Sequence, residues 1–470
     1  MNALDSVLVE LERDFKTSIE RLCDWLRIPS ISADPASAGH CRNAALWILD
    51  ELRRGGFTCE LLETPRNPVV YARFPKPGVK RILFYGHYDV QPPDPLELWR
   101  TGPFDPVIQT LDDGTEAICA RGAADDKGQV MTFVNACRAW IKSTGTLPFD
   151  VTLLIEGEEE IGSQNLGALI EAHQDRLGCD LLFVCDTNMW DRKRPAITRS
   201  LRGLLQGEVA VRCSDRDLHS GVFGGVAQNA VQVLCDMLSK VRTRDGAIAI
   251  PGFYDPVEEP PSELRAVWMA LGVKEAEFLG QVGLSKSIGE TDRALVEQMQ
   301  SRPSFDINGI SGGYQGVGGK TIIPSEATAK VSFRLVAGQN PHVIWESFER
   351  FLTEQAPVDC VLQFCKQAAS TAFAYSGAQD DIEAVATALE ATWRQPPVVV
   401  GTGVSIPIMS EFKRVLGLDA IMVGFGQEDD RIHSPNEKYD VESFRRGAES
   451  WARILCELSS GEKDVAATNA

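Results

Sequence analysis

Three short segments of this sequence place histidine and carboxylate side chains close together. Residues 86–92 read GHYDVQP, residues 121–128 read RGAADDKG, and residues 156–163 read EGEEEIGS. Each segment lies at or soon after a short apolar run, which predicts that the three lie near the ends of strands. Imidazoles and carboxylates bind divalent metal ions, and they also act as general acids and bases.

The first segment offers a histidine and an aspartate two residues apart. On an extended chain His87 and Asp89 project to the same side. A metal-bound imidazole needs its second nitrogen held, often by a carboxylate, and Asp89 is placed for that task. The alternative is a histidine at a strand end that makes an ordinary hydrogen bond.

The other two segments are rich in carboxylates. Asp125 and Asp126 could ligate a metal, or they could cap the helix predicted to follow them. Residues 156–160 carry four carboxylates in five positions directly after the apolar run VTLLI. Like charges this close repel one another unless a cation or solvent separates them, so the alternative is a solvated acidic loop.

Two further residues extend the set. Asp186 follows the apolar run LLFVC, and His433 lies in HSPNE, residues 433–437. Alone, the first could be a cap at a strand end and the second a loop histidine. Together with the three segments they supply two imidazoles and several carboxylates, which is the ligand set of a two-metal hydrolytic site.

The four motifs, in this order, resemble those of the zinc-dependent amidohydrolase family. That family includes carnosinase-type dipeptidases, glutamate carboxypeptidases, acetylornithine and succinyl-diaminopimelate deacylases, and aminoacylases. The resemblance extends from the first predicted helix to beyond His433. Residues 216–221, RDLHSG, are similar to the carnosinase-type branch in particular.

The resemblance implies a role for each residue at the metal site. It implies two divalent ions per chain, zinc or alternatively manganese or cobalt. Asp125 would bridge both ions, Glu159 would be the general base, and Asp89 would support His87. The complete set of metal ligands would be His87, Asp125, Glu160, Asp186 and His433.

The resemblance also implies a substrate pocket and a homodimer. His219 would stabilise the oxyanion from the partner subunit, although it could be a solvated loop histidine. Thr321, Arg334 and Ser405 would bind the carboxylate of the substrate, although Arg334 could instead pair with a glutamate on a strand. Gly401 and Thr402 stand where the dipeptidases carry two charged residues, which leaves the amino side of the substrate open.

The predicted function is hydrolysis of amide or peptide bonds in small substrates by a dipeptidase or related exopeptidase. It would act next to a free C-terminal carboxylate. The alternative within the family is an N-acyl amino acid deacylase. A non-catalytic binding or scaffold protein is the alternative from another class, and the intact Glu159 and ligand set count against it.

The amino-acid composition limits the classes of binding partner and the cellular compartment that we expect. The net charge of −19 excludes nucleic acid and anionic membrane surfaces as expected partners. No apolar run approaches the roughly 20 residues of a membrane span, and residues 1–14 do not resemble a signal peptide. The 12 cysteines are scattered without a C-x-x-C pair, which is typical of a reducing compartment. We therefore expect a cytoplasmic protein.

The elements that must position these residues alternate between strand and helix. Predicted strands at Arg81–Tyr85, Val151–Ile155 and Leu181–Cys185 alternate with predicted helices, which indicates an α/β fold with a largely parallel sheet. From about residue 204 the strands alternate apolar and polar residues, as one-sided sheets do. We therefore expect a catalytic domain, residues 1–203 and 376–470, interrupted by a smaller α+β lid and dimerisation domain, residues 204–375.

Overall fold

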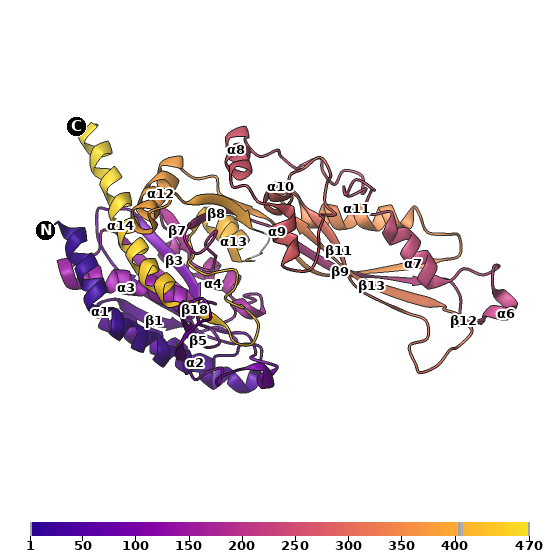
Figure 1. Cartoon of the computed structure of the whole chain (residues 1–470), viewed down its shortest axis with the longest axis horizontal. Coiled ribbons are helices and arrows are strands. Elements are labelled where there is room, and N and C mark those ends of the chain that lie inside the picture. Colours follow the sequence, from indigo (N-terminus) through magenta and orange to yellow (C-terminus); the bar gives the residue numbers. More distant parts are fainter. Residues whose placement is uncertain (1, 403–405, 407, 469–470) are drawn as a thin grey trace. The chain divides into compact units, whose positions relative to one another are not determined.

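The computed structural model describes residues 2–402, 406 and 408–468 of the chain, which forms two compact units (Figure 1). Unit 1 comprises residues 1–199, 375–400 and 411–470, and unit 2 comprises residues 200–374 and 401–410. Within the described residues, no helix is both long enough and apolar enough to cross a membrane.

Unit 1 is built on a large mixed sheet with strand order β1-β2-β6-β3-β7-β17-β8, and β16 also pairs with β8. The neighbours β6, β3, β7 and β17 run parallel, whereas β1, β2 and β8 pair antiparallel at the two sides. The strand bounds are β1 Thr58–Leu62, β2 Val69–Phe74, β3 Arg81–His87, β6 Asp150–Glu156, β7 Leu181–Val184, β8 Ala196–Leu201, β16 Val398–Thr402 and β17 Ala420–Met422.

Both faces of this sheet are covered. Phe84 and Tyr85 are consecutive on β3 and therefore point to opposite faces. Phe84 stacks on Phe133 of α3 and meets Trp451 of α14, while Tyr85 packs against Phe412. The helices that end in unit 1 are α1 Ala3–Leu26, η1 Pro35–Ser37, α2 Ala38–Arg54, η2 Leu96–Leu98, α3 Lys127–Thr144, η3 Glu159–Ile161, α4 Leu166–Ala172, α5 Gln174–Leu177, α12 Gln379–Trp393, α13 Ile408–Glu411, η4 Phe412–Leu416 and α14 Val441–Thr468.

A small antiparallel sheet in unit 1 connects distant parts of the chain. Its strand order is β18-β5-β4, with β4 at Val107–Thr110, β5 at Glu116–Cys119 and β18 at Lys438–Asp440. Because β5 and β18 run antiparallel, the segment that follows β5 and the segment that precedes β18 lie at the same end of the pair.

Unit 2 is an antiparallel sheet with order β11-β13-β9-β14 and helices α7 and α11 packed against it. Buried residues alternate along β9 and β13, so one face of the sheet holds the core. Gly207 on β9 is required for this packing, because a Cβ there would lie 2.1 Å from the ring of Trp345. The bounds are β9 Gly203–Arg212, β10 Leu218–His219, β11 Ser304–Gly312, β12 Ile322–Ile323, β13 Glu326–Leu335, β14 Val361–Ser370, β15 Phe373–Ala374, α6 Ser220–Phe223, α7 Ala230–Ser239, α8 Ser262–Ala270, α9 Glu275–Gly280, α10 Leu295–Ser301 and α11 Pro341–Thr353.

The predicted α/β class is confirmed, and the parallel strands occupy the centre of the large sheet. The central strands are near-continuous apolar runs buried on both faces, which is why their pattern identified them as parallel. The sides of the sheet are antiparallel, so the sheet is mixed.

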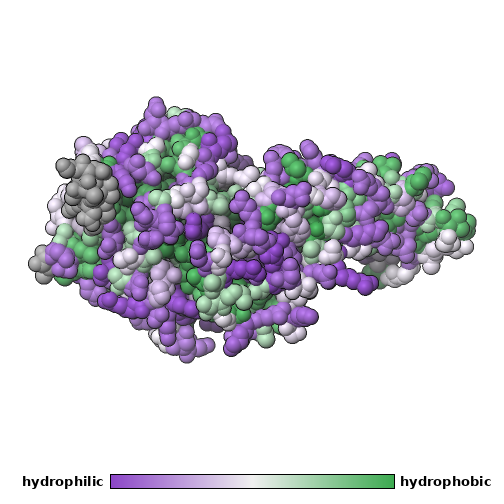
Figure 2. All heavy atoms as spheres, turned by 90° about the horizontal axis from the view of Figure 1, so that it is seen from above, coloured by the Kyte–Doolittle hydropathy of each residue, from purple (hydrophilic) through white to green (hydrophobic). Residues whose placement is uncertain are grey.

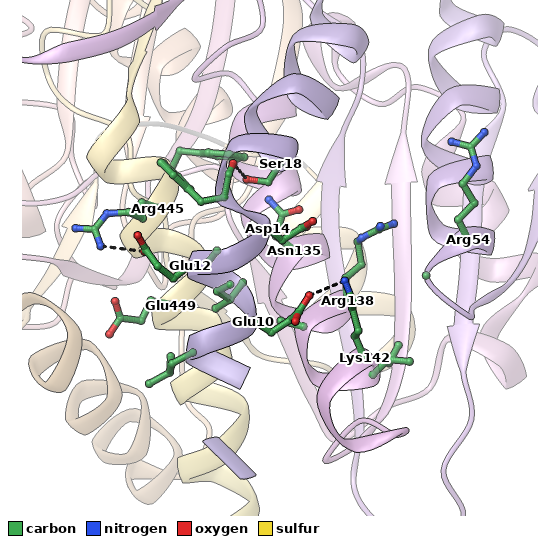
Figure 3. Close-up of a pocket in the computed structure, with 18 residues that line it drawn as sticks. Glu10, Glu12, Asp14, Ser18, Arg54, Asn135, Arg138, Lys142, Arg445 and Glu449 are labelled. Carbon is green, nitrogen blue, oxygen red and sulfur yellow. Dashed lines mark hydrogen bonds and ion pairs between the residues drawn. The ribbon is translucent and has the colours of Figure 1, made fainter. Parts of the chain in front are cut away.

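A pocket of about 370 Å³ lies among α1, α3 and α14 in unit 1 (Figure 3). Its charged side chains already have partners within the protein. Lys142 lies 2.7 Å from Glu10, and Asp14 accepts a hydrogen bond from Arg21. None of the candidate site residues lines this pocket, so it is separate from the site described next.

Candidate active site

The parallel centre of the large sheet brings the motifs together. Strands β6, β3 and β7 are neighbours, and their carboxyl ends lie at one edge. His87 is the last residue of β3, Glu156 ends β6, and Asp186 comes two residues after β7. Ligand sites in such sheets form at this edge, where loops leave the strands.

Six side chains at this edge form two groups suited to a metal ion. Within each group, one ligand atom from each residue lies within 4.8 Å of the others. The His87 group consists of His87, Glu159 and Asp186, and the Asp125 group consists of Asp125, Glu160 and His433.

Asp125 stands between the two groups. One carboxylate oxygen, Oδ1, lies 3.0 Å from Nε2 of His87. The other, Oδ2, lies 2.9 Å from Nε2 of His433. Each oxygen therefore faces a different imidazole, which is the arrangement of a carboxylate that bridges two ions.

His87 is fully buried and is oriented through its Nδ1 atom. That atom lies 3.1 Å from the backbone oxygen of Asp89 and 3.4 Å from its carboxylate. Nε2, in contrast, is buried and faces Oδ1 of Asp125 at 3.0 Å, but within the described residues it makes no hydrogen bond of good geometry. A neutral imidazole that donates through Nδ1 presents its lone pair at Nε2, so this donor set fits a metal ion.

Asp89 also holds the backbone of two adjacent glutamates, Glu159 and Glu160. Its carboxylate accepts hydrogen bonds from the backbone N–H groups of Glu159, at 3.3 Å, and Glu160, at 3.1 Å. The side chain of Gln91 donates a hydrogen bond of 2.8 Å to the carboxylate of Glu160. Residues of the first motif thus hold the third motif in place.

The four carboxylates of residues 156–160 divide into two pairs. Glu156 accepts hydrogen bonds from the hydroxyls of Tyr85, at 2.5 Å, and Ser163, at 2.7 Å. Glu158 accepts the backbone N–H of Asn67 at 3.0 Å. The other two carboxylates belong to the metal-type groups, so only half of this acidic run faces the site.

The titration of these groups shows an excess of negative charge. Burial raises the pKa of Glu160 to about 7 and that of Asp186 to about 6, and Asp125 adds to both shifts. Burial also raises the pKa of Glu159 well above its ordinary value. Hydrogen bonds to Asp125 and Glu160 raise the pKa of His433 to about 10. Buried carboxylates outnumber the imidazoles, and divalent cations would relieve their repulsion.

Three residues of the quoted motifs contact the site although the family resemblance implied no role for them. Gln91 holds Glu160, and Asp126 accepts the backbone N–H of His87 at 3.2 Å. Glu437, the last residue of HSPNE, accepts the backbone N–H of Asp125 at 3.1 Å. Their position inside the motifs was the only sequence signal.

The remaining predicted residues lie outside this group. His219, Thr321 and Arg334 belong to unit 2. His219 is exposed on β10, and its Nδ1 accepts the backbone N–H of Gly221 at 3.0 Å. Ser405 falls outside the residues that the structure describes.

The sequence of residues 83–457 matches that of peptidase family M20/M25/M40. The chain belongs to this family. Among M20 relatives, the Cys-Gly metallodipeptidase DUG1 of Candida albicans is 29% identical over 474 residues, covering 97% of this chain and 96% of the relative. The human Beta-Ala-His dipeptidase is 30% identical over 410 residues, covering 84% of this chain and 78% of the relative.

Solved M20 structures agree over nearly the whole chain. The Saccharomyces cerevisiae dipeptidase Dug1p superposes with a TM-score of 0.79 at 26% identity, covering 98% of this chain and 99% of that one. Human carnosine dipeptidase 1 gives a TM-score of 0.79 at 27% identity with the same coverage. The resemblance to carnosinase-type dipeptidases is confirmed, as is the prediction of a metal-dependent peptide hydrolase. The dipeptidase fits these relatives better than the deacylase alternative does.

Proposed function

We propose that this chain is a two-metal dipeptidase that cleaves the peptide bond next to a free C-terminal carboxylate. The observation that carries the proposal is the position of Asp125, which has one carboxylate oxygen facing His87 and the other facing His433. The buried Nε2 of His87, which makes no hydrogen bond of good geometry within the described residues, supports the same conclusion.

Five residues would hold the two ions. His87 and Asp186 would ligate one ion, Glu160 and His433 the other, and Asp125 both. Zinc suits these nitrogen and oxygen ligands, with manganese or cobalt as alternatives. Two such ions acidify water and polarise a carbonyl, because three carboxylate ligands do not neutralise two dications.

Glu159 would move the proton. It lies in the His87 group, and its backbone is held by Asp89, so its carboxylate is fixed at the site. As general base it would take a proton from the attacking water and deliver it to the leaving amine. The cations would counter the burial that raises the pKa of Glu159 in their absence.

Residues 204–375, nearly all of which belong to unit 2, would serve as the lid and dimerisation domain. His219 of one subunit would donate to the oxyanion formed at the site of the other. Thr321, Arg334 and Ser405 would bind the substrate carboxylate through two hydroxyls and a guanidinium group.

Exposed apolar side chains near His219 support a homodimer. Val222 and Phe223 of α6 are exposed, and Val226 is 84% exposed. Figure 2 shows apolar residues at the end of unit 2 where Figure 1 places α6. Apolar groups that solvent would otherwise surround favour an interface. For location we propose the cytoplasm, because all 12 cysteines are free thiols.

Metal removal tests the proposal. The full chain, dialysed against a chelator, should lose hydrolysis of Cys-Gly and β-Ala-His, and added Zn²⁺, Mn²⁺ or Co²⁺ should restore it. Elemental mass spectrometry should find up to two such ions per active chain. Full activity in protein with no detectable metal would contradict the two-metal mechanism.

A further inference from the structure

Two distant segments of unit 1 meet beside Asp125. Residues 120–125 follow β5, and residues 433–437 precede β18, which pairs with β5 through Lys438 and Cys119. The backbone N–H of Ala120 donates to the backbone oxygen of Glu437 at 3.1 Å, which continues this pairing. The segment carrying His433 therefore lies against the segment carrying Asp125.

The side chain of Glu437 fastens the two segments together. It is fully buried, and its Oε1 accepts the backbone N–H groups of Ala124, at 2.9 Å, and Asp125, at 3.1 Å. Its Oε2 accepts the backbone N–H of Gly122 at 3.0 Å and Nη1 of Arg121 at 2.8 Å. One carboxylate thus binds four donors from five consecutive residues.

We infer that Glu437 is a positioning residue for the metal site, an inference that rests on the proposed function. Among the described residues, Glu437 is not a member of either metal-type group. Instead it fixes the backbone of Asp125, and it lies four residues after His433 on the same short segment. The carboxylate of Glu437 therefore sets the distance between Asp125 and His433, although Glu437 itself would bind neither ion.

Glu437→Gln is a sharp test because it preserves the size of the side chain. An amide offers one acceptor oxygen and one donor NH₂ group. Each oxygen of Glu437 faces two donors, so the NH₂ group must point at N–H donors on one side. The segment 121–125 must then shift, and Asp125 shifts with it.

The measurement is the affinity of the metal-free full chain for Zn²⁺ alone, by competition with a chromogenic chelator. We expect Glu437→Gln to bind Zn²⁺ about 10- to 100-fold more weakly than the unmodified chain, the usual effect of losing a group behind a ligand. Glu51→Gln is the matched control. Glu51 is also a buried glutamate of unit 1, but it belongs to neither metal-type group and forms an ion pair with Arg138, 2.6 Å from it. This variant should lower the unfolding temperature and leave Zn²⁺ affinity unchanged.

The outcomes separate this inference from the proposed function. If the unmodified chain binds none of Zn²⁺, Mn²⁺ and Co²⁺, the proposed function fails. If it binds Zn²⁺, Asp125→Asn weakens that binding, and Glu437→Gln leaves it unchanged, only the inference is overturned. Should Glu437→Gln not fold, Glu437→Asp keeps the charge but shortens the reach to the four donors. Unchanged Zn²⁺ affinity in that folded variant would also overturn the inference.

A separate feature lies in unit 2, where two thiols meet at the end of the antiparallel sheet. Arg212, the last residue of β9, pairs with Val361, the first residue of β14. The next residues outward are Cys213 and Cys360, and their sulfur atoms are 2.7 Å apart. Directly opposite residues on antiparallel strands have the Cα separation that disulfides require.

We propose that Cys213 and Cys360 form a reversible disulfide by exchange with a low-molecular-weight disulfide such as glutathione disulfide. The two protein thiols are oxidised to one intramolecular S–S bond, and one glutathione disulfide is reduced to two glutathione thiols, which receive both protons. Burial raises the pKa of Cys213 to about 12, so the exchange step in which Cys213 attacks proceeds through a small thiolate fraction.

The full chain is incubated with glutathione disulfide and digested without reduction. Mass spectrometry should find one peptide pair joined through Cys213 and Cys360, and added reductant should separate it. The exposed Cys235 and Cys365 should instead carry glutathione. Cys360→Ala should abolish the cross-link and leave glutathione on Cys213. A mixed disulfide on Cys213 in the unmodified chain, with no internal cross-link, would overturn the proposal.

Discussion

Most candidate residues of unit 1 lie at or after the ends of buried parallel strands, whereas those of unit 2 lie on antiparallel strands and exposed segments. In unit 1, Asp89 holds His87 and Gln91 holds Glu160. In unit 2 the one hydrogen bond to the ring of His219 within the described part of the chain comes from the backbone of Gly221, two positions away. The metal-type groups of unit 1 are thus preorganised, whereas the role proposed for His219 would require a substrate or a partner subunit to fix its ring.

The packing beneath the two regions differs in the same way. Phe84, three residues before His87, stacks on Phe133 with ring centroids 3.9 Å apart. On the sheet of unit 2, Ile307 and Ile310 are exposed. Close packing of side chains against β3 fixes the strand that carries His87. Residues on the exposed face of the unit 2 sheet, in contrast, can be substituted without disturbing a core.

The largest effect is expected from Glu159. Glu159→Gln should lower kcat by roughly two to four powers of ten, because the general base is lost. The metal content of the purified protein, measured by elemental mass spectrometry, should barely change. Since Glu159 also lies within ligand distance of the other members of the His87 group, this variant tests whether it acts as base or as ligand.

Glu160→Gln is the matched control for that experiment. The two residues are adjacent and both contact Asp89 through their backbone, so the variants disturb the fold alike. Glu160→Gln should weaken metal binding, and part of its activity should return at high metal concentration. The opposite pattern would mean that the roles of the two glutamates are exchanged.

A smaller but still large effect is expected from His219. His219→Ala should lower kcat by about 10² to 10³, the usual cost of removing one oxyanion donor. If the residue acts across a dimer, mixing His219→Ala chains with Glu159→Ala chains should restore activity, because one of the two mixed sites holds both residues. Mixed dimers that form, as shown by native mass spectrometry, and yet stay inactive would rule out a shared site.

The sequence was sufficient for the fold class and for the location of the metal-type groups. Apolar runs predicted the strands that precede or carry His87, Glu156 and Asp186, and parallel neighbours place their carboxyl ends together. The family resemblance followed from four motifs in order, and each motif is continuous in the chain. Strands and continuous motifs can be predicted from the sequence because the pattern of apolar and polar residues that defines them lies within one short segment.

The contacts between motifs could not be predicted. Glu437 binds backbone N–H groups more than 300 residues away, and no local pattern encodes that pairing. The acidic run of residues 156–160 gave no indication that Glu156 and Glu158 turn into hydrogen-bond networks away from the metal-type groups. Such choices depend on which donors the tertiary fold brings near, and only the structure supplies them.

The smallest effect is expected from Arg334 on β13 of unit 2. Arg334→Ala should lower kcat/KM for a dipeptide by roughly one to two powers of ten, since a charge-assisted contact is worth about 1.5–3 kcal/mol. The same substrate with an amidated C-terminus should lose about as much with the unmodified enzyme, and the two losses should not add. Arg212→Ala, at an exposed end of β9, is the control and should change neither value. N-acetyl amino acids, assayed beside the dipeptides, test the deacylase alternative. Equal rates for acids and amides would contradict a carboxylate pocket.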